Sequence, residues 1–274
     1  MQAQELDVPS LIRAVEVLRA GGQGQAVEML YSAWLEQNPN HPLLYAVLFN
    51  YAVALADADR LEAARECLER AIRLNADFIP AYINLGRVYE RLGSIGGALG
   101  QWALALARMT AVTGSAITHK TTALNQSART LEAHDQDEAA EQMLRQSLEL
   151  DPTQREAIQH LIALRQRQCE WPVLVPFESV DQRTLIAGLS PLSAAALTDD
   201  PLLQLAVAHH YNQRDVPEPG EQPPRRPITA HDGPLRVGYL SSDLREHAVG
   251  YLMTEVFGLH DRRKVEVFAY YCGP

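Results

Sequence analysis

One pattern limits the possible folds of this 274-residue chain more than any other: apolar and small residues recur every 34 positions. One copy begins with Asn50-Tyr51-Ala52, and 34 residues later the next begins with Asn84-Leu85-Gly86. The other matching pairs are Leu55 and Tyr89, Asp59 and Gly93, Ala64 and Ala98, Leu68 and Trp102, and Ala71 and Ala105. A unit of this length cannot bury its own apolar face, so the period predicts stacked helix pairs.

Two further copies flank this pair. The later copy has Ala128, Leu131, Asp135, Ala140, Leu144 and Ser147, and a degenerate first copy has Ala14, Val17, Gly21, Ala26, Leu30 and Ala33. The spacing from Gly86 to Ala128 is 42 residues, which predicts an insertion of eight residues near Thr113 to Thr122. A 34-residue period is that of the tetratricopeptide repeat. We therefore predict a tetratricopeptide α-α superhelix over residues 1–168, with Thr153 to Gln168 as a capping helix.

The repeated positions have physical reasons. Small residues allow the two helices of a hairpin to approach closely, and larger apolar residues fill the space toward the next repeat. The small positions are Ala52, Gly86 and Ala128 on the first helices and Ala64, Ala98 and Ala140 on the second; the large ones are Leu68, Trp102 and Leu144. The alternative is four unrelated amphipathic helix pairs, but positions shared at one period are hard to obtain by chance.

Carboxamide side chains precede the small residue of each first helix by two positions. They are Asn50, Asn84 and Gln126. Stacked first helices form a concave groove where such arrays bind peptides. A carboxamide both donates and accepts hydrogen bonds, so it can bind an extended backbone whatever its side chains are. We expect these three residues to bind acceptor proteins or peptides; alternatively, they satisfy helix ends or contact water.

Composition and charge exclude several classes of function. The formal net charge of −10 disfavours nucleic acid as a partner. Cys67, Cys169 and Cys272 are too far apart for a zinc motif or a disulfide framework. The longest apolar stretch, Leu43 to Ala56, is too short to span a membrane, and the N-terminus lacks a secretory signal pattern. We expect a cytoplasmic protein without a membrane segment.

Residues 169–234 lose the period and are expected to be a helical connector with a proline-rich linker. Ser190-Pro191 and Asp200-Pro201 have the pattern of a helix N-cap followed by proline in the first turn. Adjacent histidines such as His209-His210 cannot share a helix face, so we expect no metal site there. Six prolines between Val216 and Pro234 exclude regular secondary structure and indicate an extended linker.

The last forty residues have an α/β pattern. Leu235 to Leu240 and Lys264 to Tyr271 are expected strands, and Val249 to His260 is an expected helix between them. This β-α-β unit cannot cover both faces of a parallel sheet, so residues 235–274 are expected to begin a longer α/β domain. The turn after the first strand lacks G-x-G-x-x-G, so neither a nicotinamide nor a flavin cofactor is expected.

Several motifs together resemble the O-linked N-acetylglucosamine transferases, a family that includes bacterial homologues and the plant SPINDLY branch. After the repeats come Cys169-Glu170-Trp171, Asp199-Asp200-Pro201, the block Leu235-Arg236-Val237-Gly238-Tyr239-Leu240-Ser241-Ser242-Asp243, His247 and Leu252-Met253. The resemblance implies a B-type glycosyltransferase with two Rossmann-like domains and no obligatory metal. It also implies transfer of N-acetylglucosamine from UDP-GlcNAc to Ser/Thr of proteins. Because the family binds the sugar nucleotide mainly in a second domain, beyond Pro274, residues 1–274 alone are expected to be inactive.

The resemblance also implies a catalytic role for His247, either as a base or as a sugar-contacting group. The residue follows the carboxyl end of the first expected strand, where open α/β sheets bind ligands. The start of the next helix is expected to favour a neutral imidazole. Tyr251 occupies the position of a second histidine in animal members and is an expected substrate contact. Three alternatives stay open: a His247 that caps its own helix, a non-catalytic peptide-binding scaffold, and a transferase using GDP-fucose.

Overall fold

The computed structural model describes residues 6–110, 113–217, 220 and 233–273. These residues form two compact units, Met1–Val216 and Pro217–Pro274. The first unit is helical, and the second contains a parallel pair of strands. Most of the expected proline-rich linker lies outside the described residues. Within the described part of the chain, no helix is both long enough and apolar enough to cross a membrane.

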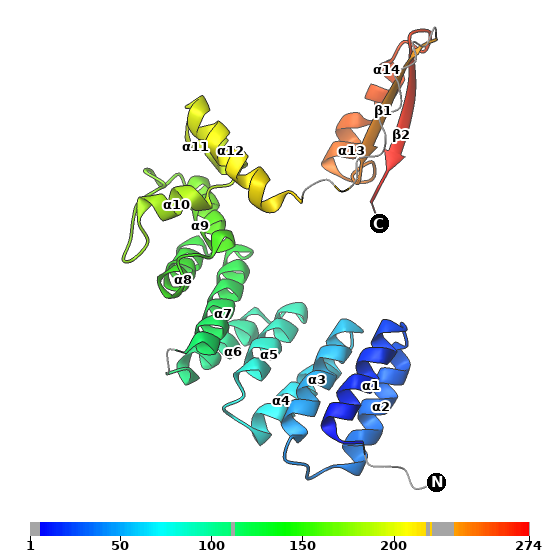
Figure 1. The fold of residues 1–274 in the computed structure, drawn as a ribbon, viewed down its shortest axis with the longest axis vertical. Helices are drawn as coiled ribbons and strands as arrows, with labels where there is room; N and C mark the ends of the chain where they lie inside the picture. The colour runs from blue at the N-terminus through cyan, green and yellow to red at the C-terminus, as the bar shows by residue number, and fades with distance from the viewer. Residues whose placement is uncertain (1–5, 111–112, 218–219, 221–232, 274) are drawn as a thin grey trace. The chain divides into compact units, whose positions relative to one another are not determined.

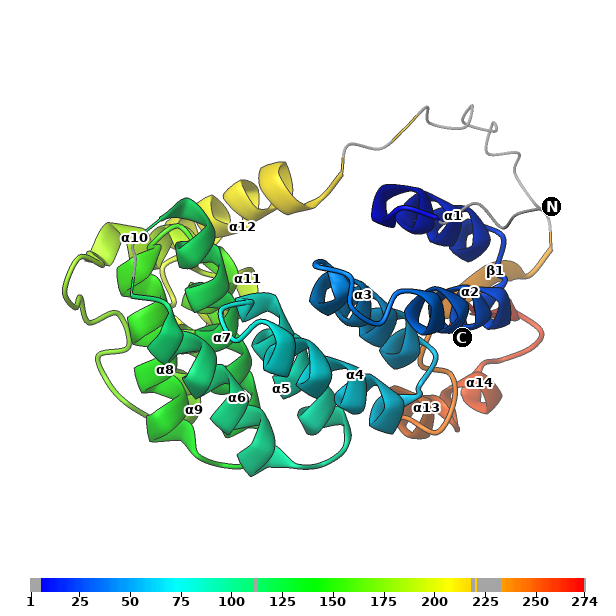
Figure 2. The same cartoon turned by 90° about the horizontal axis from the view of Figure 1, so that it is seen from below.

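The first unit begins with consecutive antiparallel helix hairpins that stack in chain order (Figures 1 and 2). The hairpins are α1 (Val8–Ala20) with α2 (Gly24–Gln37), α3 (Leu44–Asp57) with α4 (Leu61–Leu74), α5 (Ile79–Arg91) with α6 (Ile95–Arg108), and α7 (Gly114–Glu132) with α8 (Asp137–Leu150). Helix α9 (Arg155–Arg167) packs against α8. The predicted tetratricopeptide-like superhelix is confirmed.

The turn inside each hairpin requires a residue with positive φ. Gly22, Asp59, Gly93 and Asp135 have φ values of 69°, 60°, 77° and 57°. Glycine adopts this left-handed region without a steric penalty, and aspartate tolerates it better than most residues. The repeat position shared by Asp59, Gly93 and Asp135 in the sequence is therefore the left-handed residue of the turn.

The core of the array lies at the contacts that the repeat predicted. Ala52, Ala64, Ala98, Ala128 and Ala140 are fully buried. The larger residues that pack beside them, Leu68, Trp102 and Leu144, are also buried. Burial of these side chains against neighbouring hairpins provides the hydrophobic stabilisation that one hairpin alone lacks.

The eight-residue insertion lengthens a helix. Helix α7 has 19 residues, whereas the corresponding α5 has 13. Thr113 caps α7 by accepting a hydrogen bond from the backbone N–H of Ala116 at 3.3 Å. The additional residues therefore form the first turns of α7, because the threonine cap starts the helix earlier than in the other repeats.

The segment after the array folds onto its end and belongs to the same compact unit. Arg165 of α9 is almost fully buried and pairs with Glu141 of α8, with Nη2 and Oε1 2.8 Å apart. Its Nη1 donates to the carbonyl oxygen of Val173 at 3.0 Å, which attaches the loop after α9. Two short helices follow, α10 (Gln182–Gly188) and α11 (Pro191–Leu197), and then the 15-residue helix α12 (Pro201–Asp215). Ser190 and Asp200 accept first-turn N–H hydrogen bonds from α11 and α12, which confirms both predicted N-caps.

The second unit contains strands β1 (Leu235–Ser241) and β2 (Val265–Tyr271), which pair in parallel from Leu235 with Val265 to Ser241 with Tyr271. Between them, the single helix expected from the sequence is divided into α13 (Ala248–Met253) and α14 (Val256–Leu259). Tyr239 of β1 contacts Phe257 edge-on, with ring centroids 5.1 Å apart. Its hydroxyl lies 2.7 Å from Nε2 of His260, so α14 and the residue after it are held by the strand.

Candidate functional site

His247 lies in the loop that follows the carboxyl end of β1, at the N-cap position of α13. Its Nδ1 accepts a hydrogen bond from the backbone N–H of Val249 at 3.2 Å. The nearest acidic group is Asp243, whose Oδ2 lies 3.9 Å from the same nitrogen. The imidazole is partly exposed, with 44% of its side-chain surface accessible. The capping role considered from the sequence is therefore present, and the chemical role stays a prediction.

The capping hydrogen bond determines the tautomer of the neutral His247 ring. Because Nδ1 accepts the Val249 N–H, the neutral ring carries its hydrogen on Nε2. In this tautomer Nε2 carries the hydrogen and donates a hydrogen bond. A donor at this position suits contact with an oxygen of a sugar or a phosphate. To act as a base through Nε2, the ring must move its hydrogen to Nδ1 and release Val249. Helix α13 has six residues, so its dipole has less influence than the longer helix expected from the sequence.

A glycine that the sequence argument did not single out shapes the loop around His247. A Cβ on Gly250 would overlap the carbonyl oxygen of Arg245 and lie 3.0 Å from that of Asp243. The His247 N–H also donates to the Arg245 carbonyl at 2.7 Å. Only glycine permits the loop to fold this closely over α13. The sequence signal was the presence of glycine inside an expected helix.

Tyr251 lies one helical turn after His247 in α13. Its backbone N–H donates to the His247 carbonyl oxygen at 3.0 Å, and its residue surface is 68% exposed. Residues four apart on a helix lie on the same side. The ring of Tyr251 is therefore available to a ligand that contacts His247, and the expected substrate contact stays a prediction.

The two asparagines predicted to bind peptide have the same local geometry. Asn50 Nδ2 donates to the Ala46 carbonyl at 2.9 Å, and Asn84 Nδ2 donates to the Pro80 carbonyl at 3.0 Å. Each bond uses one of the two amide hydrogens and orients the side chain along its own helix. Within the described ranges, Oδ1 and the second hydrogen form no further hydrogen bond and are left for a ligand. The two residues are structurally equivalent, as the period predicts.

Gln126 departs from this arrangement. Its Oε1 accepts a hydrogen bond from Arg129 Nη2 at 2.8 Å, and the same nitrogen lies 2.7 Å from Glu90 Oε2. Gln126 lines a cavity of about 270 Å³ together with Asn125, Arg129 and His160. The structure therefore places Gln126 in a hollow on the first-helix side of the last repeat, where an arginine already occupies its acceptor oxygen.

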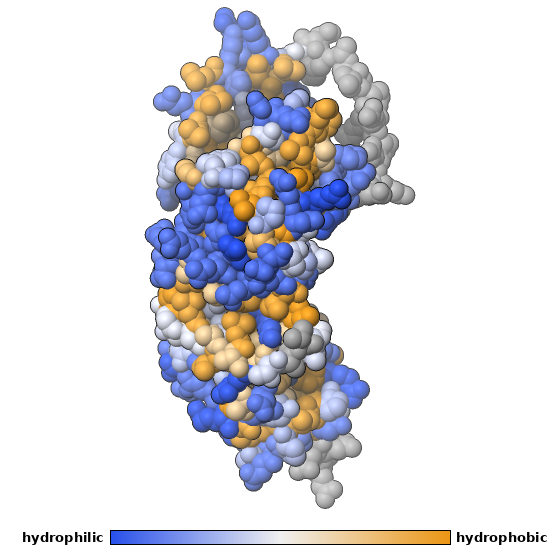
Figure 3. Space-filling model, turned by 90° about the vertical axis from the view of Figure 1, so that its left-hand side faces the viewer, coloured by the Kyte–Doolittle hydropathy of each residue, from blue (hydrophilic) through white to orange (hydrophobic). Residues whose placement is uncertain are grey.

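The surface that Figure 3 shows is mixed in character. On the face shown in Figure 3, patches of apolar side chains are interrupted by hydrophilic ones. Among the described residues, no group of three or more His, Cys, Asp or Glu side chains is arranged to hold a metal ion.

Helix hairpins with this period and these turn residues define a tetratricopeptide-like superhelix, and known proteins share its features. A tetratricopeptide-repeat model matches residues 54–93, and the model of glycosyl transferase family 41 matches residues 221–274. A tetratricopeptide repeat protein from Parabacteroides merdae has a similar fold, with a TM-score of 0.53 at 18% identity. That match covers 74% of this chain and 72% of the other.

Two relatives with similar sequences have names that describe N-acetylglucosaminyltransferases. A probable UDP-N-acetylglucosamine–peptide N-acetylglucosaminyltransferase of Arabidopsis thaliana, SEC, is 34% identical over 97 residues. The match covers 32% of this chain and 10% of that protein. The UDP-N-acetylglucosamine–peptide N-acetylglucosaminyltransferase of Caenorhabditis elegans is 53% identical over 36 residues, 13% of this chain and 3% of that protein. The chain thus resembles the tetratricopeptide N-terminal portion of an O-linked N-acetylglucosamine transferase, as the sequence motifs predicted, and covers a tenth or less of these relatives.

Proposed function

We propose that residues 1–274 form the N-terminal portion of a protein O-glycosyltransferase. The complete protein transfers N-acetylglucosamine from UDP-GlcNAc to Ser/Thr hydroxyls, and the repeats bind the acceptor polypeptide. One observation carries the proposal: the family 41 glycosyltransferase match over residues 221–274 follows a tetratricopeptide array in one chain. Arrays of this kind bind polypeptides along the surface of their first helices.

The groove residues support an acceptor that binds in extended form. Asn50 and Asn84 present an oxygen and an amide hydrogen each, in equivalent geometry on neighbouring first helices. A peptide backbone offers both N–H and C=O groups at every residue except proline. Recognition through the backbone tolerates many side chains, which suits an enzyme that modifies Ser and Thr in different sequence contexts.

The geometry at His247 favours a binding role over general-base chemistry. In the transfer, the acceptor hydroxyl forms a bond to the anomeric carbon, loses its proton, and UDP leaves. With Nδ1 occupied by the Val249 N–H, Nε2 donates a hydrogen bond. Such a donor stabilises negative charge on an oxygen of the donor substrate as UDP departs. The proton of the acceptor hydroxyl is then taken by another group of the complete site.

The test separates the capping role of His247 from its chemical role. We compare His247→Asn with His247→Ala in the complete natural protein and use His210→Ala, an exposed histidine of α12, as the control. Asparagine is a strong N-cap, so His247→Asn preserves the cap and removes the imidazole. We measure sugar transfer, UDP-GlcNAc affinity and thermal unfolding.

The proposal predicts that both His247 variants lose transfer by about 100-fold or more, with His247→Asn unchanged in melting temperature. The control keeps wild-type transfer. If His247→Asn retains activity within about threefold of wild type, less than 1 kcal/mol in barrier, His247 has no place in the active site.

A further inference from the structure

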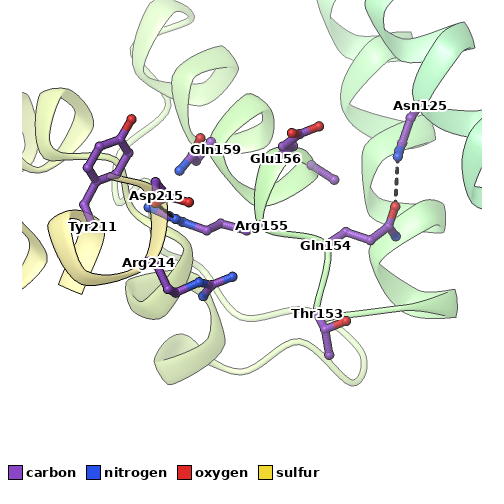
Figure 4. Close-up of a pocket in the computed structure, with 10 residues that line it drawn as sticks. Asn125, Thr153, Gln154, Arg155, Glu156, Gln159, Tyr211, Arg214 and Asp215 are labelled. Atoms are coloured by element: carbon purple, nitrogen blue, oxygen red, sulfur yellow. Dashed lines mark hydrogen bonds and ion pairs between the residues drawn. The ribbon is translucent and has the colours of Figure 1, made fainter. Parts of the chain in front are cut away.

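A second polar pocket lies at the end of the repeat array, in the first unit. It has a volume of about 500 Å³ and lies where α7, the start of α9 and the end of α12 meet (Figure 4). Its polar walls come from Asn125 of α7, from Arg155, Glu156 and Gln159 of α9, and from Arg214 and Asp215 of α12. The expected peptide-binding positions Asn50, Asn84 and Gln126 do not line it.

A hydrogen-bond network fixes the orientation of Asn125 in this pocket. Gln154 Nε2 donates to the carbonyl oxygens of Ser147 at 2.9 Å and Asp151 at 3.0 Å, so Gln154 Oε1 must be an acceptor. Asn125 Nδ2 donates to that oxygen at 2.8 Å, as the dashed line in Figure 4 shows. The remaining oxygen, Asn125 Oδ1, is buried and has no hydrogen-bond partner among the residues that the structure describes. A buried acceptor beside the pocket therefore lacks a donor.

Arg155 also lines this pocket, and it has hydrogen-bond donors where Asn125 has an acceptor. Only 10% of its side-chain surface is exposed, its Nη1 is paired with Asp215, and the ring of Tyr211 covers it with the centroid 5.0 Å from Cζ. Nε and Nη2 are buried and have no hydrogen-bond partner in the described part of the chain. These two nitrogens form one edge of the guanidinium plane, which matches the two oxygens of a carboxylate. Leaving both N–H groups unsatisfied costs free energy that a bound carboxylate recovers.

Two further features make the pocket favourable for an anion. Helix α9 is 13 residues long and begins here without a side-chain cap, so its first N–H groups lack intrahelical acceptors. Arg155 pairs with Asp215, and Arg214 adds a second cation to a lining that also includes the exposed carboxylate of Glu156. A polypeptide satisfies both needs, since its carboxylate accepts from Arg155 and its N–H donates to Asn125. A fully ionised phosphate ester offers acceptors only.

We propose that this pocket binds a carboxylate of the acceptor polypeptide, from an Asp or Glu side chain or from a chain terminus. The carboxylate accepts hydrogen bonds from Nε and Nη2 of Arg155, and a peptide N–H donates to Asn125 Oδ1. The proposal rests on the proposed function, in which the array binds a polypeptide. With this pocket, the array prefers acceptor polypeptides that have acidic residues, in addition to binding their backbone through Asn50 and Asn84.

The test follows the Nε–H resonance of Arg155 and the side-chain amide of Asn125 by NMR in the 274-residue chain. The probes are N-acetyl-glutamate N-methylamide, its glutamine counterpart, N-acetyl-alanine with a free carboxylate, and inorganic phosphate, all at equal ionic strength. Saturable shifts of both resonances are expected with the glutamate probe, the free-acid probe or both, and not with the glutamine probe. The two carboxylate probes distinguish a side chain from a terminus.

Arg155→Lys keeps the charge but removes the guanidinium edge, and it should lose the response at Asn125 by at least about tenfold in affinity. Arg87→Lys on α5, an exposed arginine, should keep it. The inference is overturned if no carboxylate probe shifts Arg155 in the wild-type chain, if the glutamine probe shifts it equally, or if phosphate binds more tightly. Blocked amino acids cannot span the groove, so such a failure leaves binding through Asn50 and Asn84 to be judged separately.

Discussion

The indole ring of Trp102 in α6 lies directly against Gly86 of α5. A Cβ built on Gly86 would lie only 2.6 Å from Cε2 of Trp102. Trp102 is fully buried, and its Nε1 donates to the Ile83 carbonyl at 3.1 Å. In the preceding hairpin the same two positions are Ala52 and Leu68, both buried. The array therefore balances the size of the two positions, with glycine opposite tryptophan and alanine opposite leucine.

This relationship predicts that Gly86→Ala destabilises the array. The added methyl must displace the ring of Trp102 or the helix, which costs roughly 1–3 kcal/mol, only partly offset by the better helix propensity of alanine. Urea unfolding measures the change. Gly100→Ala in α6 is the control, because no atom lies within 4 Å of its Cβ position. It should stabilise the protein by about 0.5–1 kcal/mol, and equal effects of the two substitutions would contradict the proposed contact.

The buried ion pair at the end of the array predicts a second difference. Arg165→Ala leaves Glu141 and the Val173 carbonyl without their partner, because the Arg165 and Glu141 side chains are only 6% and 13% exposed. We expect a loss of about 3–5 kcal/mol in unfolding free energy. Arg167→Ala, two residues later, removes ion pairs whose arginine is 50% exposed and should cost less than about 1 kcal/mol. Similar losses for the two variants would show that the Arg165 network does not hold the loop.

Cys67 should be the least reactive thiol of the native protein. Burial raises its pKa to about 11, so at pH 8 only about one molecule in a thousand carries the thiolate. Cys169 and Cys272 are exposed. Alkylation by iodoacetamide, followed by mass spectrometry, should label these two first and Cys67 only after unfolding. Labelling of all three at one rate in the native chain would refute the burial of Cys67.

The same shift gives a pH dependence of stability. The folded state keeps the Cys67 proton to a higher pH than the unfolded chain does, because an unperturbed thiol has a pKa of about 8.5. The contribution is complete below that value and is lost as the pH rises toward about 11. The Cys67→Ala variant should show a shallower loss of stability across this window than the wild-type chain, and identical slopes would contradict the assignment.

Replacing Asn50 and Asn84 should weaken peptide binding without unfolding the array. Each lost hydrogen bond is expected to cost about 1 kcal/mol, or about fivefold in affinity. Fluorescence anisotropy with a peptide selected by display against the wild-type chain measures this for Asn50→Ala, Asn84→Ala and the double variant. Gln142→Ala, exposed on α8, is the control. A double variant that binds as tightly as the control would exclude these asparagines from the peptide site.

The repeat architecture could be predicted from the sequence because its determinants are local and recur. Asp59 and Asp135 occupy the turn position where glycine stands in another copy, and the structure gives all of these residues a positive φ. Likewise, the N-caps at Ser190 and Asp200 follow from a residue and the proline beside it. Information of this kind does not depend on distant parts of the chain.

Features that join distant segments could not be predicted in the same way. The pair of Arg165 with Glu141 joins two helices. The pocket around Arg155 includes Asp215 of α12, which lies 60 residues later in the chain. The residues around Arg165 and Arg155 in the sequence do not indicate which distant residue pairs with each arginine. The contacts of Tyr239 in β1 with Phe257 and His260 likewise join residues that are far apart in the sequence.

The most direct test of the central claim is sugar transfer by the complete natural protein that contains these residues. Denatured proteins from the same cells are incubated with it and either UDP-GlcNAc or GDP-fucose, and the modified residues are identified by mass spectrometry. The account predicts N-acetylhexosamine on Ser and Thr with UDP-GlcNAc and no modification with GDP-fucose. Transfer of fucose alone, or no transfer from either donor, would contradict it.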